Sequence, residues 1–193
     1  MEAHETSELI EAHHGEDRRK NRTALTISIL AMVLAIASLG GSNSAKEATQ
    51  ENILAANAYA FYQAKTIRQG ALKIAVTEME LQLLREPAMP PVAKQAIGGK
   101  IDDYKKTIER YDSEPETKEG RKELLSQAKE HETARDHALR QDPWFDYAEG
   151  MLQIAIVLLS VSIIASLPAL FYAGAVLGLF ASLATLNGFF LLV

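Results

Sequence analysis

Residues 45–86 contain no proline and only one glycine, Gly70, and this stretch constrains the fold more than any other part of the chain. Apolar residues recur through it every seven positions, and smaller or polar residues follow the first three of them four places later. The repeat consists of Ile53, Ala60, Ile67, Ile74 and Leu81, and the residues between them are Asn57, Ala64 and Ala71. This spacing is typical of a coiled-coil seam, and its small residues allow a partner helix to come close. An unbroken helix of this length extends on the order of 60 Å, so we expect a partner along it.

Composition shows that this helix belongs to a membrane protein. The chain has 193 residues and a net charge of -5, but its apolar residues are concentrated at 24–39 and 151–193, whereas most charged residues lie elsewhere. Segments of this kind are typical of membrane spans, and the mild acidity argues against a nucleic-acid partner. Because there is no cysteine, disulfides, thiolate metal sites and cysteine nucleophiles are excluded. The sequence therefore predicts an all-α membrane protein.

The first predicted span follows a run of basic residues. Arg18, Arg19, Lys20 and Arg22 precede the uncharged segment 24–39. Basic residues favour the cytoplasmic side, so we expect an uncleaved membrane anchor with its N-terminus cytoplasmic and the middle region on the opposite side. A cleaved signal peptide would look similar, but its basic run would stand at the start of the chain.

The polar tail before the anchor is predicted to be loosely ordered or partly helical. It holds His4, His13 and His14 beside carboxylates, but no rigid third ligand accompanies them, so we expect no metal site. After the anchor, residues 40–44 predict either a flexible joint or a stiff continuation into the long helix. Ser44 is the expected N-cap of that helix, with Glu47 completing a capping box.

The most distinctive passage of the long helix is AANAYAFYQAKTIRQ. Together with the basic run before the first span and two closing spans, it resembles a family of uncharacterised bacterial membrane proteins, domain of unknown function 4337. The resemblance extends over most of the chain. It implies a protein of a bacterial inner membrane, so the middle region is expected to be periplasmic, and it implies no activity, substrate or catalytic residue.

Two interpretations of this passage remain open. In the first, its aromatic residues and asparagine pack against a partner helix, with the asparagine setting the register. In the second, a ligand or partner groove is lined by Tyr59, Tyr62, Gln63, Lys65 and Arg68. The predicted face for helix packing or a partner comprises Asn57, Tyr59, Phe61, Tyr62, Gln63 and Lys65. No acid, base and nucleophile accompany these residues, so we expect no catalysis.

The middle region is predicted to fold back along the long helix. Three prolines within residues 86–91 predict a turn, and a second helix then begins at Val92. Its apolar residues alternate at spacings of four and three, which predicts a coiled-coil face lying antiparallel along the C-terminal half of the long helix. A third, highly charged helix is expected over 115–141, capped by Ser113 or Glu114. His131 and His137 lie six residues apart, on different faces of that helix, and so do not form a metal-binding pair.

The C-terminal part is predicted to cross the membrane again. Asp142 and Pro143 are expected to start a new helix, followed by aromatic residues typical of a membrane interface. Spans over 149–167 and 169–193 are separated by Pro168, and they form either a tight hairpin or one bent, re-entrant element. Small and polar residues predicted to pack the spans together are Gly174, Gly178, Ser182, Asn187 and Gln153.

These predictions divide the chain into a polar tail (1–22), a first transmembrane helix (23–40), an extramembrane antiparallel coiled-coil hairpin (41–142) and two further transmembrane helices (143–193). The leading functional hypothesis is a self-associating membrane-anchored scaffold, or an accessory subunit of a larger membrane complex, without cofactors. Membrane lipid and further copies of the chain are the expected partners. The alternatives are a ring-forming pore with the coiled coils as its vestibule, and a membrane sensor of a small ligand.

Overall fold

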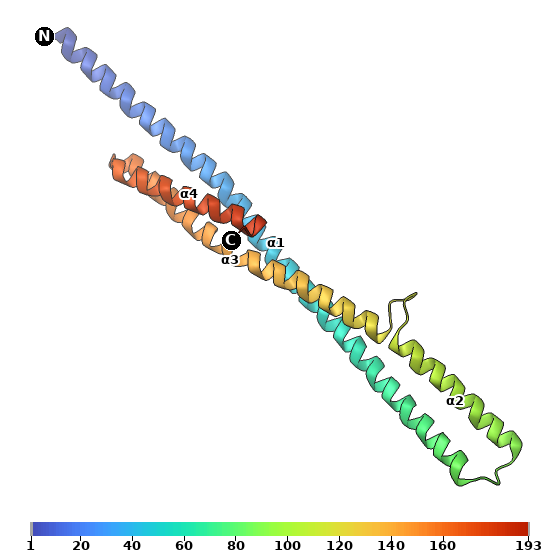
Figure 1. Ribbon diagram of the computed structural model, residues 1–193. Coiled ribbons are helices and arrows are strands. Elements are labelled where there is room, and N and C mark those ends of the chain that lie inside the picture. The colour runs from blue at the N-terminus through green and yellow to red at the C-terminus, as the bar shows by residue number, and fades with distance from the viewer. Residues whose placement is uncertain (1, 193) are drawn as a thin grey trace. The chain divides into compact units, whose positions relative to one another are not determined.

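The structure, a computed structural model, describes the backbone of residues 2–192 and the side chains of residues 17–192. Over the described residues it contains four helices and no strand: α1 (Glu2–Arg85), α2 (Pro91–Asp112), α3 (Arg121–Ala165) and α4 (Pro168–Phe190) (Figure 1). The predicted all-α class is confirmed. Helices α1, α3 and α4 are each long and apolar enough to cross a membrane. The chain forms two compact units, Met1–Ala48 with Asp136–Val193, and Thr49–Arg135.

Helix α1 continues without a break through residues 40–44, so these residues are helical and Ser44 is not an N-cap. The glycines there allow close packing. A Cβ atom on Gly40 would lie 2.5 Å from the ring of Phe145, and only a glycine lets the α3 side chain approach so closely. The backbone of the tail belongs to α1 as well, while the side chains of His4, His13 and His14 lie outside those that the structure describes.

The first unit is a bundle of α1, α3 and α4. Its buried core consists of Leu30, Ala37, Ala148, Leu152, Ala155, Leu159, Ala181 and Ala184. Phe145 packs edge to face on Phe189, with 4.8 Å between ring centroids, and Leu159 lies against Gly174. Residue numbers therefore rise along α3 as they fall along α4, so these helices pack antiparallel on either side of the break before Pro168.

The expected helix start at Asp142 and Pro143 is wrong, because α3 runs through Pro143 to Ala165. A proline inside a helix removes one hydrogen bond and clashes with the preceding turn. Tertiary packing on the following turn outweighs this cost, since Phe145 and Ala148 are almost completely buried.

The predicted start of the third helix is also wrong. Helix α3 begins at Arg121, and residues 113–120 form a connector in which Lys118 has a positive φ of 57°. The carboxylate of Glu123 accepts hydrogen bonds from the Ser113 hydroxyl (2.6 Å) and the Glu114 backbone N–H (3.1 Å). These bonds hold the connector back against the first turn of α3, so that Ser113 and Glu114 do not serve as its caps.

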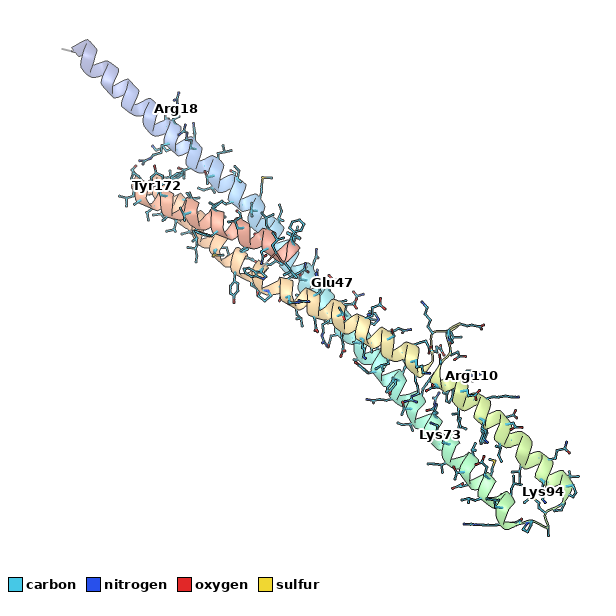
Figure 2. All side chains as sticks on the ribbon, in the orientation of Figure 1. Arg18, Glu47, Lys73, Lys94, Arg110 and Tyr172 are labelled. Carbon is cyan, nitrogen blue, oxygen red and sulfur yellow. The ribbon has the colours of Figure 1, made fainter. Side chains whose placement is uncertain are left out.

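In the second unit, α1 contacts α2 and then α3. Lys105 pairs with Glu80 at 2.8 Å, and Gln69 Nε2 donates to the Ile108 carbonyl at 3.0 Å. Because residue numbers rise along α2 as they fall along α1, the two are antiparallel, as Figure 1 shows. The turn expected at 86–91 is present, and Lys94 donates to the Pro87 carbonyl across it (Figure 2). Helix α2 thus contacts the C-terminal half of the long helix.

Candidate functional site

Helix α1 has two seven-residue series in the second unit, and they lie on opposite sides of it. Ala55, Gln69 and Val76 are 3%, 4% and 7% exposed, and they face α2 and α3. The predicted seam starts two residues before Ala55, at Ile53, and two residues correspond to about 200° around a helix. Its side chains consequently point away from the rest of the unit.

We call this exposed surface the outer stripe. It consists of Ile53, Asn57, Ala60, Ala64, Ile67, Ala71, Ile74 and Leu81, all of them exposed. The four large apolar members are 54%, 73%, 63% and 42% exposed for Ile53, Ile67, Ile74 and Leu81 respectively. An exposed apolar surface of this regularity is a candidate contact for another helix.

The six residues of the predicted partner face do not form one surface. Asn57, Phe61 and Gln63 are exposed, whereas Tyr59, Tyr62 and Lys65 turn toward α3 and the connector. The Tyr59 hydroxyl donates to Glu132 at 3.1 Å, and this hydrogen bond raises the pKa of the tyrosine. Part of the passage therefore packs within the second unit and part of it is exposed.

Arg121, which sequence reasoning did not single out, joins α1 to the start of α3. Its guanidinium donates to Thr66 Oγ1 at 2.9 Å, to Gln69 Oε1 at 2.6 Å and to the Tyr62 hydroxyl at 3.2 Å. It also lies 5.2 Å from the centre of the Tyr62 ring. The planar fork of arginine suits this arrangement, because it offers several donors in one plane and a face for stacking. The seven-residue spacing of Tyr62 and Gln69 places both on one face, but no local pattern identifies Arg121 as their partner.

Ionised groups around Arg121 secure the connector between α2 and α3. Lys122 pairs with Asp112 at 2.8 Å, and this contact lowers the pKa of the aspartate. The hydrogen bond from Ser113 to Glu123 lowers the pKa of that glutamate in the same way. Both carboxylates are therefore held in the charged form in the folded chain.

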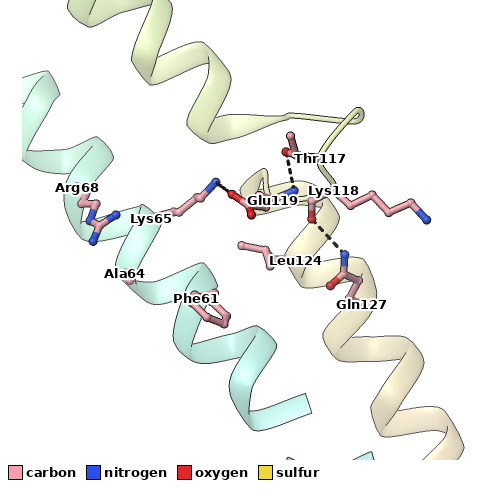
Figure 3. Close-up of a pocket in the computed structure, with 9 residues that line it drawn as sticks. All are labelled: Phe61, Ala64, Lys65, Arg68, Thr117, Lys118, Glu119, Leu124 and Gln127. Atoms are coloured by element: carbon pink, nitrogen blue, oxygen red, sulfur yellow. Dashed lines mark hydrogen bonds and ion pairs between the residues drawn. The ribbon is translucent and has the colours of Figure 1, made fainter. Parts of the chain in front are cut away.

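A groove of about 450 Å³ lies beside this junction (Figure 3). Its lining comprises Phe61, Ala64, Lys65, Arg68, Thr117, Lys118, Glu119, Leu124 and Gln127. Lys65 reaches from α1 to Glu119 at 3.6 Å and to Glu114 at 3.7 Å. Of the five residues expected to line a ligand groove, Lys65 and Arg68 do so, while Tyr59, Tyr62 and Gln63 are not among the lining residues. The groove combines apolar side chains with three cations and the carboxylate of Glu119, which pairs with Lys65.

The predicted packing residues of the last span lie at helix contacts within the first unit or close to them. Gly174 and Gly178 are buried, and a Cβ atom on Gly178 would lie 2.5 Å from Leu30 of α1. Ser182 donates to the Gly178 carbonyl of its own helix at 2.8 Å. Asn187 is buried, and its side-chain oxygen accepts the Leu192 N–H at 2.8 Å, which caps the end of α4.

Gln153 was predicted to join two spans, but its hydrogen bond stays within α3. Its side chain is exposed, and it donates to Glu149 of the same helix at 3.3 Å.

The two histidines of α3 lie apart. His131, in the second unit, lies 2.6 Å from Glu51, whereas His137, in the first unit, is exposed. Among the residues that the structure describes, no group of three or more histidine, aspartate or glutamate side chains is placed to hold a metal ion.

Comparison with other proteins identifies a family and no characterised relative. Neither a curated protein nor a solved structure matches the chain. A family described as "Domain of unknown function (DUF4337)" matches residues 19–191. The matched range contains the apolar part of all three candidate spans and the junction of α1, α2 and α3. The match covers well over half of the sequence, and the chain belongs to this family.

Proposed function

We propose that this protein is a self-associating, membrane-anchored helical scaffold, or an accessory subunit of a bacterial envelope complex, without catalytic activity. The observation that supports it is the outer stripe. A hairpin that acted alone would need one apolar face on α1, and this helix carries a second on the opposite side. The second face gives the middle region a coiled-coil surface for further helices.

The exposed apolar area is of a useful size for association. Full burial of an isoleucine or leucine side chain contributes about 1.5–3 kcal/mol. The four large residues of the stripe are 42–73% exposed, so their burial would contribute roughly 3–7 kcal/mol per copy. Association costs about 4–15 kcal/mol in lost freedom of motion. Two copies would thus gain about as much as association costs, and anchoring in one membrane lowers that cost by raising the effective concentration.

The proposed location is a bacterial inner membrane. Arg18, Arg19, Lys20 and Arg22 precede the first candidate span, and basic residues favour the cytoplasmic side. With α1 crossing the membrane once before the second unit begins, the middle region would stand in the periplasm. A single cysteine in place of Glu114, labelled in intact cells by a membrane-impermeant thiol reagent, tests this orientation; protection until lysis contradicts it.

Self-association is tested by the mass of the purified full-length protein in mild detergent and in lipid nanodiscs over a range of concentrations. We expect oligomers, and we expect Ile67→Lys to weaken them. Val92→Lys is the matched control, because Val92 is 78% exposed in the same unit but lies outside the stripe. A protein that stays monomeric at every concentration would rule the scaffold out.

A second candidate function, sensing of a small organic anion, is favoured by the groove beside Arg121. Arg68 and Lys118 supply positive charge, and Phe61 and Leu124 supply apolar surface. The probe is benzoate, added to the protein in nanodiscs. Sensing predicts that benzoate raises the unfolding temperature of the native protein and of Arg110→Glu, but not of Arg68→Glu. An unfolding temperature that does not respond to benzoate or similar carboxylates would argue against this function.

A further inference from the structure

We infer that the outer stripe pairs with the same stripe of a second copy, in parallel and in register, with Asn57 of each copy facing Asn57 of the other. This inference rests on the proposed self-association and adds to it the surface, the direction and the register. It follows from the length of the stripe, the position of its one amide and the continuity of α1.

The length of the stripe matches what a specific interface needs. Ile53 and Leu81 are separated by 28 residues, which is about 42 Å of helix or about four heptads. A strip of that length and about 12 Å wide covers roughly 500 Å² on each copy. The total of roughly 1,000 Å² reaches the lower limit for a specific protein interface. The alanines of the stripe, Ala60, Ala64 and Ala71, allow the two helices to approach closely along this length.

Asn57 is the one amide of the stripe and lies at a core position of the repeat; Glu78, four residues after Ile74, occupies the one charged core position and is exposed. It follows Ile53 by four residues and precedes Ala60 by three, and its side chain is exposed. An amide offers both donors and an acceptor, so two such side chains that face each other can bond together. In parallel two-stranded coiled coils, an asparagine at this position specifies register and the number of strands. Any shift in register would bury each amide against apolar side chains, which is unfavourable.

The continuity of α1 favours the parallel direction. One unbroken helix contains both the first candidate span and the stripe. Along this helix, Ile53 is nearer to the span than Leu81 is, in every copy. Copies inserted the same way into one bilayer therefore bring like ends of their stripes together.

Disulfide cross-linking tests the pairing directly, since the native chain has no cysteine. Ala64→Cys and Ala71→Cys are made separately in the full-length protein, oxidised in nanodiscs that hold two copies, and compared with Ser126→Cys, an exposed position on α3. We expect each stripe variant to form covalent dimers at least about tenfold faster than the control, because a disulfide requires Cα atoms about 4.4–6.8 Å apart.

Other results would overturn the inference in distinguishable ways. If Ala64→Cys and Ala71→Cys react no faster than Ser126→Cys while the protein remains a dimer by mass, copies associate elsewhere and only the inferred surface is wrong. If Ile53→Cys cross-links to Leu81→Cys in a mixture but neither cross-links to itself, the pairing is antiparallel. A monomer by mass would contradict the proposed function as well.

The role of Asn57 has its own test. Asn57→Ile should broaden the distribution of oligomer masses, because it removes the polar pair that selects two strands. Gln63→Ile, which changes an exposed amide outside the stripe, should leave the distribution unchanged. An unaltered distribution in Asn57→Ile would show that this residue does not determine the register.

Discussion

Replacement of Arg121 by alanine tests whether the junction between α1, α2 and α3 depends on one guanidinium. The side chain is 21% exposed and makes three hydrogen bonds to α1. Hydrogen bonds from a charged group contribute about 1.5–3 kcal/mol each, but those of one side chain are not additive. Loss of the guanidinium also removes the donor to Gln69 Oε1, in a side chain that is 4% exposed, which costs about 1–3 kcal/mol. Because solvent screens part of these interactions, we expect Arg121→Ala to lower the free energy of opening the junction by about 3 kcal/mol.

This loss should appear as local opening at the start of α3. A change of about 3 kcal/mol corresponds to amide hydrogen exchange that is faster by about 100-fold when reclosing is fast and exchange follows the opening equilibrium. Exchange is followed by mass spectrometry in the full-length protein in nanodiscs, over peptides from 113–130. Arg121→Lys keeps the charge but loses the planar fork, so it should show most of the effect.

The neighbouring Lys122 supplies the control for this measurement. Its side chain is 69% exposed and forms one ion pair with Asp112, and exposed pairs of this kind contribute little to stability because water screens them. Lys122→Ala should therefore change exchange less than tenfold. If Arg121→Ala accelerates exchange no more than Lys122→Ala does, the hydrogen bonds around the guanidinium do not stabilise the junction and the reasoning is refuted.

Three further predictions follow from other contacts. Because the Ser113 hydroxyl lowers the pKa of Glu123, the ionised carboxylate stabilises the connector fully above the unfolded pKa and less as pH falls through the lower folded value. Protection of the amides over 113–130 relative to intrinsic exchange at the same pH should therefore fall below about pH 4, and Ser113→Ala should shift this fall to higher pH; identical pH profiles would contradict the assignment. Gly178→Leu places a side chain where Leu30 of α1 lies within 2.5 Å, so thermal unfolding of the first unit should begin at a lower temperature than in Leu179→Ala, a change at an exposed position. Vesicles that contain the protein should retain a trapped fluorescent dye as well as empty vesicles do, because the proposed scaffold forms no path for solutes; rapid release would favour the alternative of a ring-forming pore.

Local sequence patterns were sufficient for the parts of the fold that depend on neighbouring residues. The uncharged segments predicted the three candidate spans, and the prolines near residue 90 predicted the turn between α1 and α2. Gly174 and Gly178 were recognised as positions of close helix contact because small residues at a spacing of four lie on one helix face. In each case the relevant interaction is local or depends only on hydrophobicity and size.

Local patterns failed where a distant residue alters the preference of the backbone. Pro143 indicated a helix start, but α3 continues through Pro143 because Phe145 packs against Gly40. Pro115 also indicated a helix start, but Glu123 holds the connector in another conformation. Arg121 was missed entirely, since its acceptors lie more than fifty residues earlier in the chain.

The sequence by itself determined that α1 is a long helix with an apolar seam, because a seven-residue repeat of apolar residues is a property of one helix. It did not determine which side of the helix faces the rest of the chain. The series that contains Ala55, Gln69 and Val76 also repeats every seven residues, and the outer stripe that begins at Ile53 is more apolar. Tertiary structure decided between them, because Gln69 bonds to the Ile108 carbonyl of α2 and to Arg121 of α3. Those long-range hydrogen bonds require the less apolar face to turn inward, and they leave the more apolar one exposed.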